Sequence, residues 1–139
     1  MIFLDDAVNR AIRNEAEASY PNECCGILLG TVDPDGARSV TEIIEIDNTS
    51  DADEQYHRFT IGPDDFMRAE IEARRRGVDV LGFYHSHPDH PAMPSDYDLK
   101  HAMPCYSYVI VAVESGKSAA LTSWEMTPDR ARFIQELQR

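Results

Sequence analysis

The sequence has no hydrophobic run close to the ~20 residues that are needed to span a bilayer. Its N-terminus, MIFLDDAVNRAIRNEAEASY, lacks the basic start and the apolar stretch of a secretory signal. It has only three cysteines, and two of them, Cys24 and Cys25, are adjacent, which is a poor disulfide framework. These absences argue against a membrane partner and a secreted protein. We therefore expect a cytoplasmic protein.

Positive charge is also scarce. The chain has 13 Lys and Arg residues against 25 Asp and Glu residues, which gives a formal net charge of −12, and its only lysines are Lys100 and Lys117. Non-specific binding of nucleic acid depends on neutralising phosphates, so this charge argues against a nucleic-acid partner. The length of 139 residues suits a single domain, and we expect residues 1–139 to share one core.

The hydrophobic pattern alternates between helical and extended periods. Helices are expected at residues ~5–19, ~63–76 and 95–102, and strands at 24–31, 38–46, 56–61, 78–84, 106–113 and 119–126. The helix at 63–76 has the clearest end signals, with Pro63 in its first turn and Gly77 directly after it. The tail after Pro128 is ambiguous between helix and strand. Strands interleaved with helices predict a layered α/β domain.

Histidine is rare as well, but three of the five histidines lie within YHSHPDHPAMPSDYD, residues 84–98. His85 and His87 follow a predicted strand, and residues i and i+2 of an extended chain point to the same face. A carboxylate from the next helix would complete a set of nitrogen and oxygen ligands that zinc prefers. The pattern therefore favours a zinc site over a polar loop that faces solvent.

Two known metal-site patterns fit this segment and imply different proteins. The first, His-X-His-X-Asp-His, is typical of metallo-β-lactamase-like hydrolases and would add Asp89 and His90 to the two histidine ligands. That fold normally needs a longer chain and more ligands far downstream. The only histidine after His90 is His101. The match is therefore unsupported beyond six residues.

The second pattern is His-X-His, seven residues, Ser, two residues and Asp, and Ser95 and Asp98 complete it without an insertion. With this pattern the sequence resembles the MPN/JAMM zinc metallopeptidases, in particular their short prokaryotic members. That family carries a glutamate upstream at a strand start, usually before Cys-Gly, and Glu23 occupies this place in PNECCGILLG. The resemblance covers most of the chain, roughly from the first helix to Glu125.

The resemblance implies both a fold and a site. The fold would be a three-layer α-β-α domain, in which helices flank a mixed, mostly antiparallel sheet, similar to that of cytidine deaminases. His85, His87 and Asp98 would bind Zn²⁺, and water would take the fourth position. Glu23 would take the proton of that water and pass it to the leaving amine. Ser95 would donate a hydrogen bond to the oxyanion.

The implied reaction is hydrolysis of a peptide or isopeptide bond after the C-terminal Gly-Gly of a ubiquitin-like or sulfur carrier protein. Two alternatives stay open: a non-catalytic MPN scaffold or binding module, because some relatives lack metal, and the metallo-β-lactamase-like hydrolase. A zinc deaminase is rejected because its Pro-Cys-X-X-Cys ligands are missing after Pro104.

Overall fold

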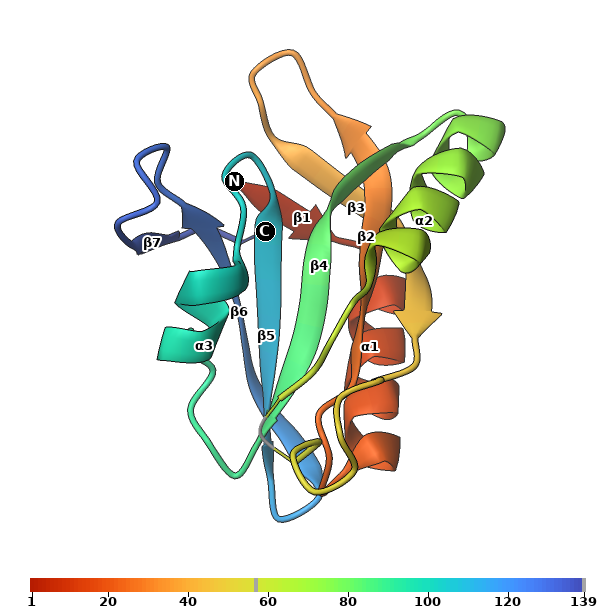
Figure 1. Cartoon of the computed structure of the whole chain (residues 1–139). Coiled ribbons are helices and arrows are strands. Elements are labelled where there is room, and N and C mark those ends of the chain that lie inside the picture. The colour runs from red at the N-terminus through yellow and green to blue at the C-terminus, as the bar shows by residue number, and fades with distance from the viewer. Residues whose placement is uncertain (57, 139) are drawn as a thin grey trace.

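The computed structural model describes residues 1–56 and 58–138, and in it one seven-stranded sheet is covered by helices (Figure 1). The strand order is β1-β3-β2-β4-β5-β6-β7. The strands are β1 (Ile2–Leu4), β2 (Cys25–Val32), β3 (Arg38–Ile46), β4 (Asp79–Pro88), β5 (Ser107–Glu114), β6 (Lys117–Met126) and β7 (Phe133–Gln135). The helices are α1 (Asp6–Ser19), α2 (Pro63–Arg76) and α3 (Asp96–His101).

The sheet is mixed and mostly antiparallel, which confirms the expected fold class. β1 pairs with β3 and β4 pairs with β5 in parallel. The other four neighbouring pairs are antiparallel. None of the helices in the described part of the chain combines the length and the apolar character that a membrane crossing requires.

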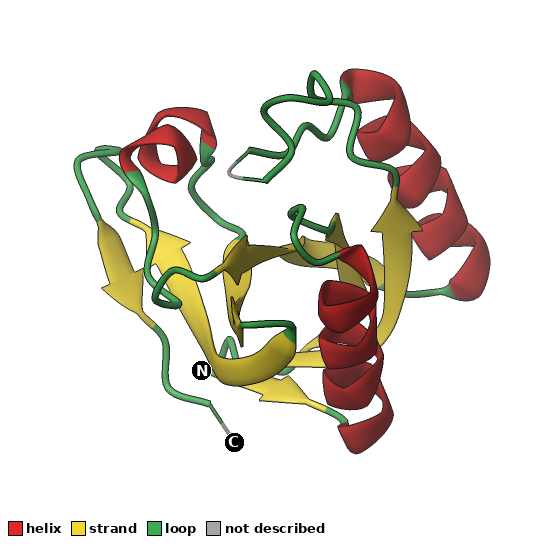
Figure 2. Cartoon of the chain, turned by 90° about the horizontal axis from the view of Figure 1, so that it is seen from below, coloured by secondary structure: helices red, strands yellow, loops and turns green. Residues whose placement is uncertain are grey.

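Helices lie on both faces of this sheet, which gives three layers (Figure 2). Ile12 of α1 packs in one cluster with Leu28 of β2. The neighbouring Ile27 belongs to a second cluster, together with Ala69 of α2 and Ala102 at the end of α3. Because successive side chains of a strand point to opposite faces, α1 covers one face and the other two helices cover the opposite face. Apolar burial on both faces stabilises the central strands.

The two ends of the sheet meet near the chain termini. Ile2 pairs with Arg38 of β3 on one side, and on the other side it forms an isolated bridge to Gln138. The N–H of Ile2 also donates to the carbonyl of Leu137 at 3.0 Å. The curled sheet therefore covers part of the edge that β1 would otherwise present to solvent.

Three features differ from the sequence-based expectation. The strand predicted at 56–61 is wrong: its described residues form turns and irregular chain, and His57 lies outside the described residues. The backbone bonds there are local, since Arg58 N–H donates to the carbonyl of Glu54. The strand predicted at 78–84 extends to Pro88 and so contains both histidines. Strands β1 and β7 were not predicted, because three residues are too few to show the alternating hydrophobic pattern of a strand.

Candidate metal centre

β4 places two histidine rings on one face of the sheet. His85 pairs with Cys25 of β2 and with Ile110 of β5, so its backbone is held from both sides. Side chains two residues apart on such a strand point the same way, here toward the face that carries α2 and α3. The side chains are almost fully buried, with 1% of His85 and 6% of His87 exposed. The sheet therefore gives both imidazoles a fixed and largely dry position.

The start of α3 brings a carboxylate to the same place. Ser95 is the N-cap of this helix, and its Oγ accepts the N–H of Asp98 at 3.1 Å. In return, Asp98 Oδ2 accepts the N–H of Ser95 at 2.8 Å. This reciprocal capping box satisfies two backbone donors at the helix start and fixes the aspartate side chain. Local helix chemistry thus orients the third expected ligand.

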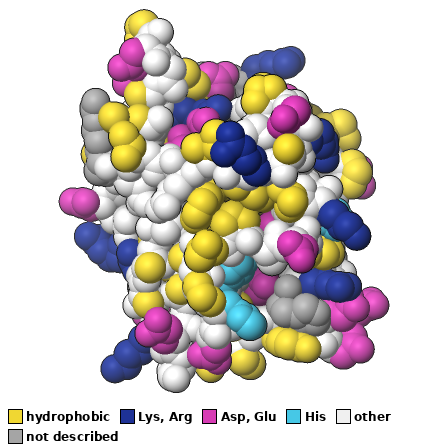
Figure 3. Space-filling model, turned by 90° about the vertical axis from the view of Figure 1, so that its left-hand side faces the viewer, with side chains coloured by type: hydrophobic (Ala, Val, Ile, Leu, Met, Phe, Trp, Pro, Cys, Tyr) yellow, Lys and Arg dark blue, Asp and Glu magenta, His cyan; other side chains and the backbone are white. Residues whose placement is uncertain are grey.

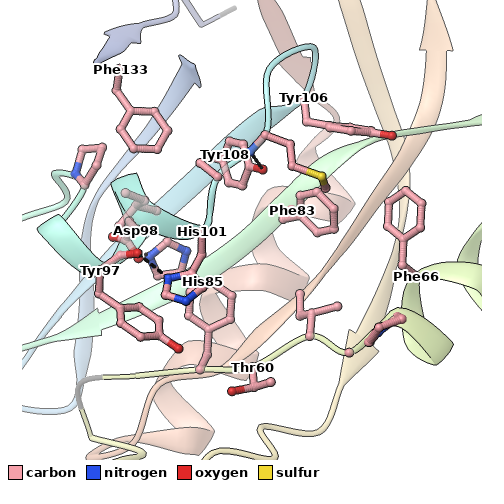
Figure 4. Close-up of a pocket in the computed structure, with 18 residues that line it drawn as sticks. Thr60, Phe66, Phe83, His85, Tyr97, Asp98, His101, Tyr106, Tyr108 and Phe133 are labelled. Carbon is pink, nitrogen blue, oxygen red and sulfur yellow. Dashed lines mark hydrogen bonds and ion pairs between the residues drawn. The ribbon is translucent and has the colours of Figure 1, made fainter. Parts of the chain in front are cut away.

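The three side chains converge on one point, and Figure 4 shows two of them, His85 and Asp98. The Nε2 atoms of His85 and His87 are 3.1 Å apart, and each lies close to Asp98 Oδ2, at 3.3 Å and 3.2 Å. A tetrahedral zinc ion with bonds of about 2.0–2.1 Å spaces its ligand atoms by roughly 3.3–3.4 Å. The two imidazole nitrogens and the carboxylate oxygen therefore fit a tetrahedral ion in spacing and in chemistry.

The hydrogen bonds and charges of the site suit metal ligation. His87 Nδ1 donates to the carbonyl of Pro91 at 2.9 Å, which leaves the lone pair on Nε2 directed at the site. Nδ1 of His85 is buried without a hydrogen-bond partner among the described residues. Burial lowers the pKa of His85, which favours the neutral form that binds metal. Burial alone would raise the pKa of Asp98, but the neighbouring His85 and His87 and the N–H of Ser95 hold it well below its ordinary value.

Glu23 lies at the edge of this site, two residues before β2 begins. Its side chain is buried, and burial raises its pKa to about 8. The charge of His87 lowers this pKa and the charge of Asp98 raises it. Cys24, the next residue, is hydrogen-bonded to β4: its N–H donates to Ser86 Oγ at 2.8 Å. The residue between the two histidines thus holds the segment that carries Glu23.

An apolar cavity of about 530 Å³ opens beside the ligands (Figure 4). Figure 3 shows histidine side chains next to a hydrophobic patch on this surface. At the ligand end, the ring of Phe59 stacks on His85 with centroids 4.4 Å apart. The cavity is lined mainly by apolar and aromatic side chains, which include Phe59, Ile61, Phe66, Phe83, Tyr97, Tyr106, Tyr108 and Phe133. An extended, largely uncharged segment of a substrate fits such a surface.

Other polar residues of the 84–98 segment stand apart from the three ligands. Asp89 accepts hydrogen bonds from the hydroxyl of Tyr20 and the N–H of Ser115, and His90 is exposed. His101, which follows this segment, lines the cavity and bonds to the carbonyl of Tyr97. In the described part of the chain, the group that could hold a metal contains neither Asp89 nor His90. This geometry argues against the metallo-β-lactamase-like alternative.

All five residues expected at the site lie in or beside it, and two further contributors were missed by sequence reasoning. Ser86 was treated only as the spacer of the His-X-His pattern, and Phe59 was placed in a strand that does not form. Both act through contacts between segments far apart in the chain. A period or a motif within one segment cannot reveal such contacts.

Comparison with protein families gives one match that covers most of the chain. Residues 5–127 match the family described as prokaryotic homologues of the JAB domain. Over 130 residues the chain is 31% identical to a desampylase of Haloferax volcanii, which covers 93% of this chain and 87% of the relative. Over 86 residues it is 30% identical to a probable TtuB-protein conjugate cleaving protease of Thermus thermophilus, which covers 62% of this chain and 57% of that protein.

Solved structures agree with the fold. A protein of Salinibacter ruber has a TM-score of 0.76 at 40% identity, over 97% of this chain and 88% of the other. A protein of Desulfitobacterium hafniense has a TM-score of 0.85 at 29% identity, over 100% and 92%. A JAB1/MPN domain protein of Archaeoglobus fulgidus has a TM-score of 0.58 at 20% identity, over 99% and 97%, and supports the fold alone.

Proposed function

Because this chain belongs to the family of prokaryotic homologues of the JAB domain, we propose that it is a zinc-dependent metallopeptidase or isopeptidase. Its substrate would be a bond after the C-terminal Gly-Gly of a ubiquitin-like or sulfur carrier protein. The observation that carries the proposal is the triangle of His85, His87 and Asp98 with the buried carboxyl of Glu23 beside it. The name of the Thermus relative specifies a protein conjugate as its substrate, which supports this substrate class.

In this proposal His85, His87 and Asp98 hold one zinc ion, and the fourth position stays open, as is typical of catalytic zinc. Bound zinc would supply a Lewis acid that lowers the pKa of a water molecule toward neutrality. The three ligands come from a central strand and a capped helix, so the site is formed before substrate arrives. Such preorganisation limits the cost of rearrangement during the reaction.

Glu23 acts as the general base and then as the general acid. Water attacks the carbonyl carbon of the scissile bond while the carboxylate takes its proton, and the same proton passes to the nitrogen as the carbon–nitrogen bond breaks. Burial holds the pKa of this carboxyl near 8, which makes the carboxylate a stronger base than an exposed glutamate. The positive charge of a bound metal favours its ionised form.

Ser95 stabilises the oxygen of the scissile carbonyl. Its Oγ accepts the N–H of Asp98, and this bond uses a lone pair and leaves the hydroxyl proton free to donate. The side chain is exposed at the site, so a substrate carbonyl can reach it. A single O–H donor placed where negative charge develops is a common catalytic device.

The partner's tail would lie in the apolar cavity and reach the ligands with Gly-Gly at the scissile bond. We place the whole activity in one domain formed by residues 1–139. The three cysteines of the chain are unpaired, which suits a cytoplasmic location with reduced thiols.

The test uses a sulfur carrier or ubiquitin-like protein from the same organism, extended by a few residues past Gly-Gly. The fusion is incubated with the protein and its intact mass is followed, with and without a chelator. We expect a product that ends at Gly-Gly, that is lost on chelation and that returns when zinc is added. The matched control is Glu23→Gln, which should give no product with zinc bound. Absence of cleavage by zinc-loaded wild-type protein, across the carriers of that organism, would contradict the proposal.

A further inference from the structure

The segment that connects β3 to α2 is here called the site loop, and the structure describes its residues 47–56 and 58–62 (Figure 1). Phe59, Thr60 and Ile61 line the cavity, and Phe59 also stacks on the ligand His85. Arg58 lies over the ring of Tyr97 in α3, 5.0 Å from its centroid. The loop is thus packed against the surface that a substrate would contact.

The same loop holds the backbone of Glu23 from both sides. The N–H of Glu23 donates to the carbonyl of Gln55 at 2.7 Å, and its carbonyl accepts from Asn48 Nδ2 at 3.1 Å. Glu23 precedes β2, so its own N–H and carbonyl are not part of the sheet, although the next residue is bonded to Ser86 of β4. The position of Glu23 relative to the two histidines therefore depends on its bonds to the loop as well as on the pairing of β2 with β4.

Asn48 connects these bonds into one network. Its Nδ2 also donates to the carbonyl of Arg58 at 2.7 Å, and its Oδ1 accepts the N–H of Ser50 at 3.1 Å. Gln55 Nε2 donates to the backbone carbonyl of Asn48 at 3.1 Å. Both protons of the Asn48 amide group are used, one toward Glu23 and one toward the residue before Phe59. A single side chain therefore joins the general base to the segment that lines the cavity.

We propose that Asn48 is a positioning residue for the reaction, and that its side-chain amide, through its bond to Arg58, fixes Glu23 relative to the cavity-lining segment 59–62. The role of Glu23 as general base rests on the proposed function, whereas the two hydrogen bonds that the Asn48 amide group donates do not depend on it. Asparagine fits this role because it has two donors on a short side chain. An aspartate of the same shape would face two carbonyl oxygens without a proton to share.

The test compares Asn48→Asp and Asn48→Ala with the control Ser50→Ala. The control removes the 2.7 Å hydrogen bond between Ser50 Oγ and Thr60 Oγ1 in the same loop, and leaves the partners of Glu23 in place. Amide hydrogen exchange is measured at Glu23, in chelator-treated and in zinc-loaded protein. We expect exchange to be roughly fivefold faster in both Asn48 variants, the factor that corresponds to about one net hydrogen bond, and unchanged in the control.

Steady-state kinetics on the carrier fusion separates positioning from general stability. With zinc content unchanged, we expect kcat to fall by about tenfold or more in the Asn48 variants, while KM stays within about twofold, because the base is misplaced and binding is not. The control should keep both constants. Unchanged exchange at Glu23 would overturn the proposal, and so would faster exchange with an unchanged kcat. If wild-type protein cleaves no carrier, the proposed function fails, but exchange still decides whether Asn48 holds Glu23.

Discussion

Ser95 caps α3, and we propose that it also stabilises the oxyanion; the structure allows these two roles to be tested separately. Its Oγ caps α3 by accepting the N–H of Asp98, and its hydroxyl proton is free to donate to a substrate carbonyl. The bond from Ser95 N–H to Asp98 Oδ2 belongs to the backbone and survives any side-chain change. Replacing the side chain therefore tests the cap and the donor without removing the backbone bond that orients the ligand.

The two roles predict effects of different size. Loss of a Ser N-cap costs about 1 kcal/mol of stability, within a range of about 0.5–2. Loss of one oxyanion donor lowers kcat by roughly 10²–10³-fold, which corresponds to about 2.7–4 kcal/mol. Ser95→Ala should show both losses. Ser95→Asp should recover the cap, because Asp and Ser are equally good N-caps, but not the donor. Ser95→Thr should retain most of both.

The assay measures zinc content, the free energy of unfolding and kcat on the carrier fusion for each variant. We expect zinc near one equivalent in all of them, stability lowered only in Ser95→Ala, and kcat lowered in both Ser95→Ala and Ser95→Asp. If Ser95→Asp restored wild-type kcat together with stability, the hydroxyl would act only as a cap. That result would refute its role at the oxyanion.

Three further predictions concern the base, the ligands and a carboxyl group on the opposite face. Glu23→Gln should keep its zinc and lose at least about 10²-fold in kcat, because it removes the base and not a ligand; metal analysis and turnover on one preparation decide this. His87→Ala should lose zinc and should no longer gain thermal stability when zinc is added, unlike wild type; full zinc occupancy would mean that the ligand set is wrong. Burial raises the pKa of Glu15 to about 7, and this carboxyl accepts the hydroxyl of Tyr84. As pH rises, Glu15 therefore ionises in the unfolded chain before it ionises in the folded protein, so the free energy of unfolding should fall between about pH 4.5 and 7. After allowance for partial exposure, we expect this fall to be about 1–2 kcal/mol larger in wild type than in Glu15→Gln. An equal pH dependence of the free energy of unfolding in the two proteins would contradict the prediction.

The grouping of the three proposed ligands could be predicted from the sequence because their geometry is local. His85 and His87 are two residues apart on one strand, and this spacing alone puts both rings on the same face. Asp98 is three residues from the N-cap Ser95, which is a capping-box spacing within one helical turn. Neither inference depends on how segments far apart in the sequence pair. This is why the three residues expected as ligands lie together in the structure.

The surroundings of the ligands depend on contacts that no local pattern contains. The approach of Glu23 to the site follows from pairing between β2 and β4, where Cys25 lies opposite His85, and it was expected only through the family resemblance. The segment around Phe59 was predicted as a strand because its residue types suit one. In the structure the carbonyl of Arg58 bonds instead to Asn48, ten residues earlier. Hydrogen bonds from side chains to the backbone thus take the place of the strand-to-strand hydrogen bonds that the residue types of this segment favoured.

The central claim is that a single zinc ion held by His85, His87 and Asp98 is required for cleavage. The measurement that tests it most directly is a zinc titration of chelator-treated protein, with bound metal and cleavage of the carrier fusion followed in the same samples. We predict that cleavage rises in proportion to bound zinc and saturates at about one equivalent per chain. Cleavage that persists after the metal is removed, or that saturates only at two equivalents, would contradict this account.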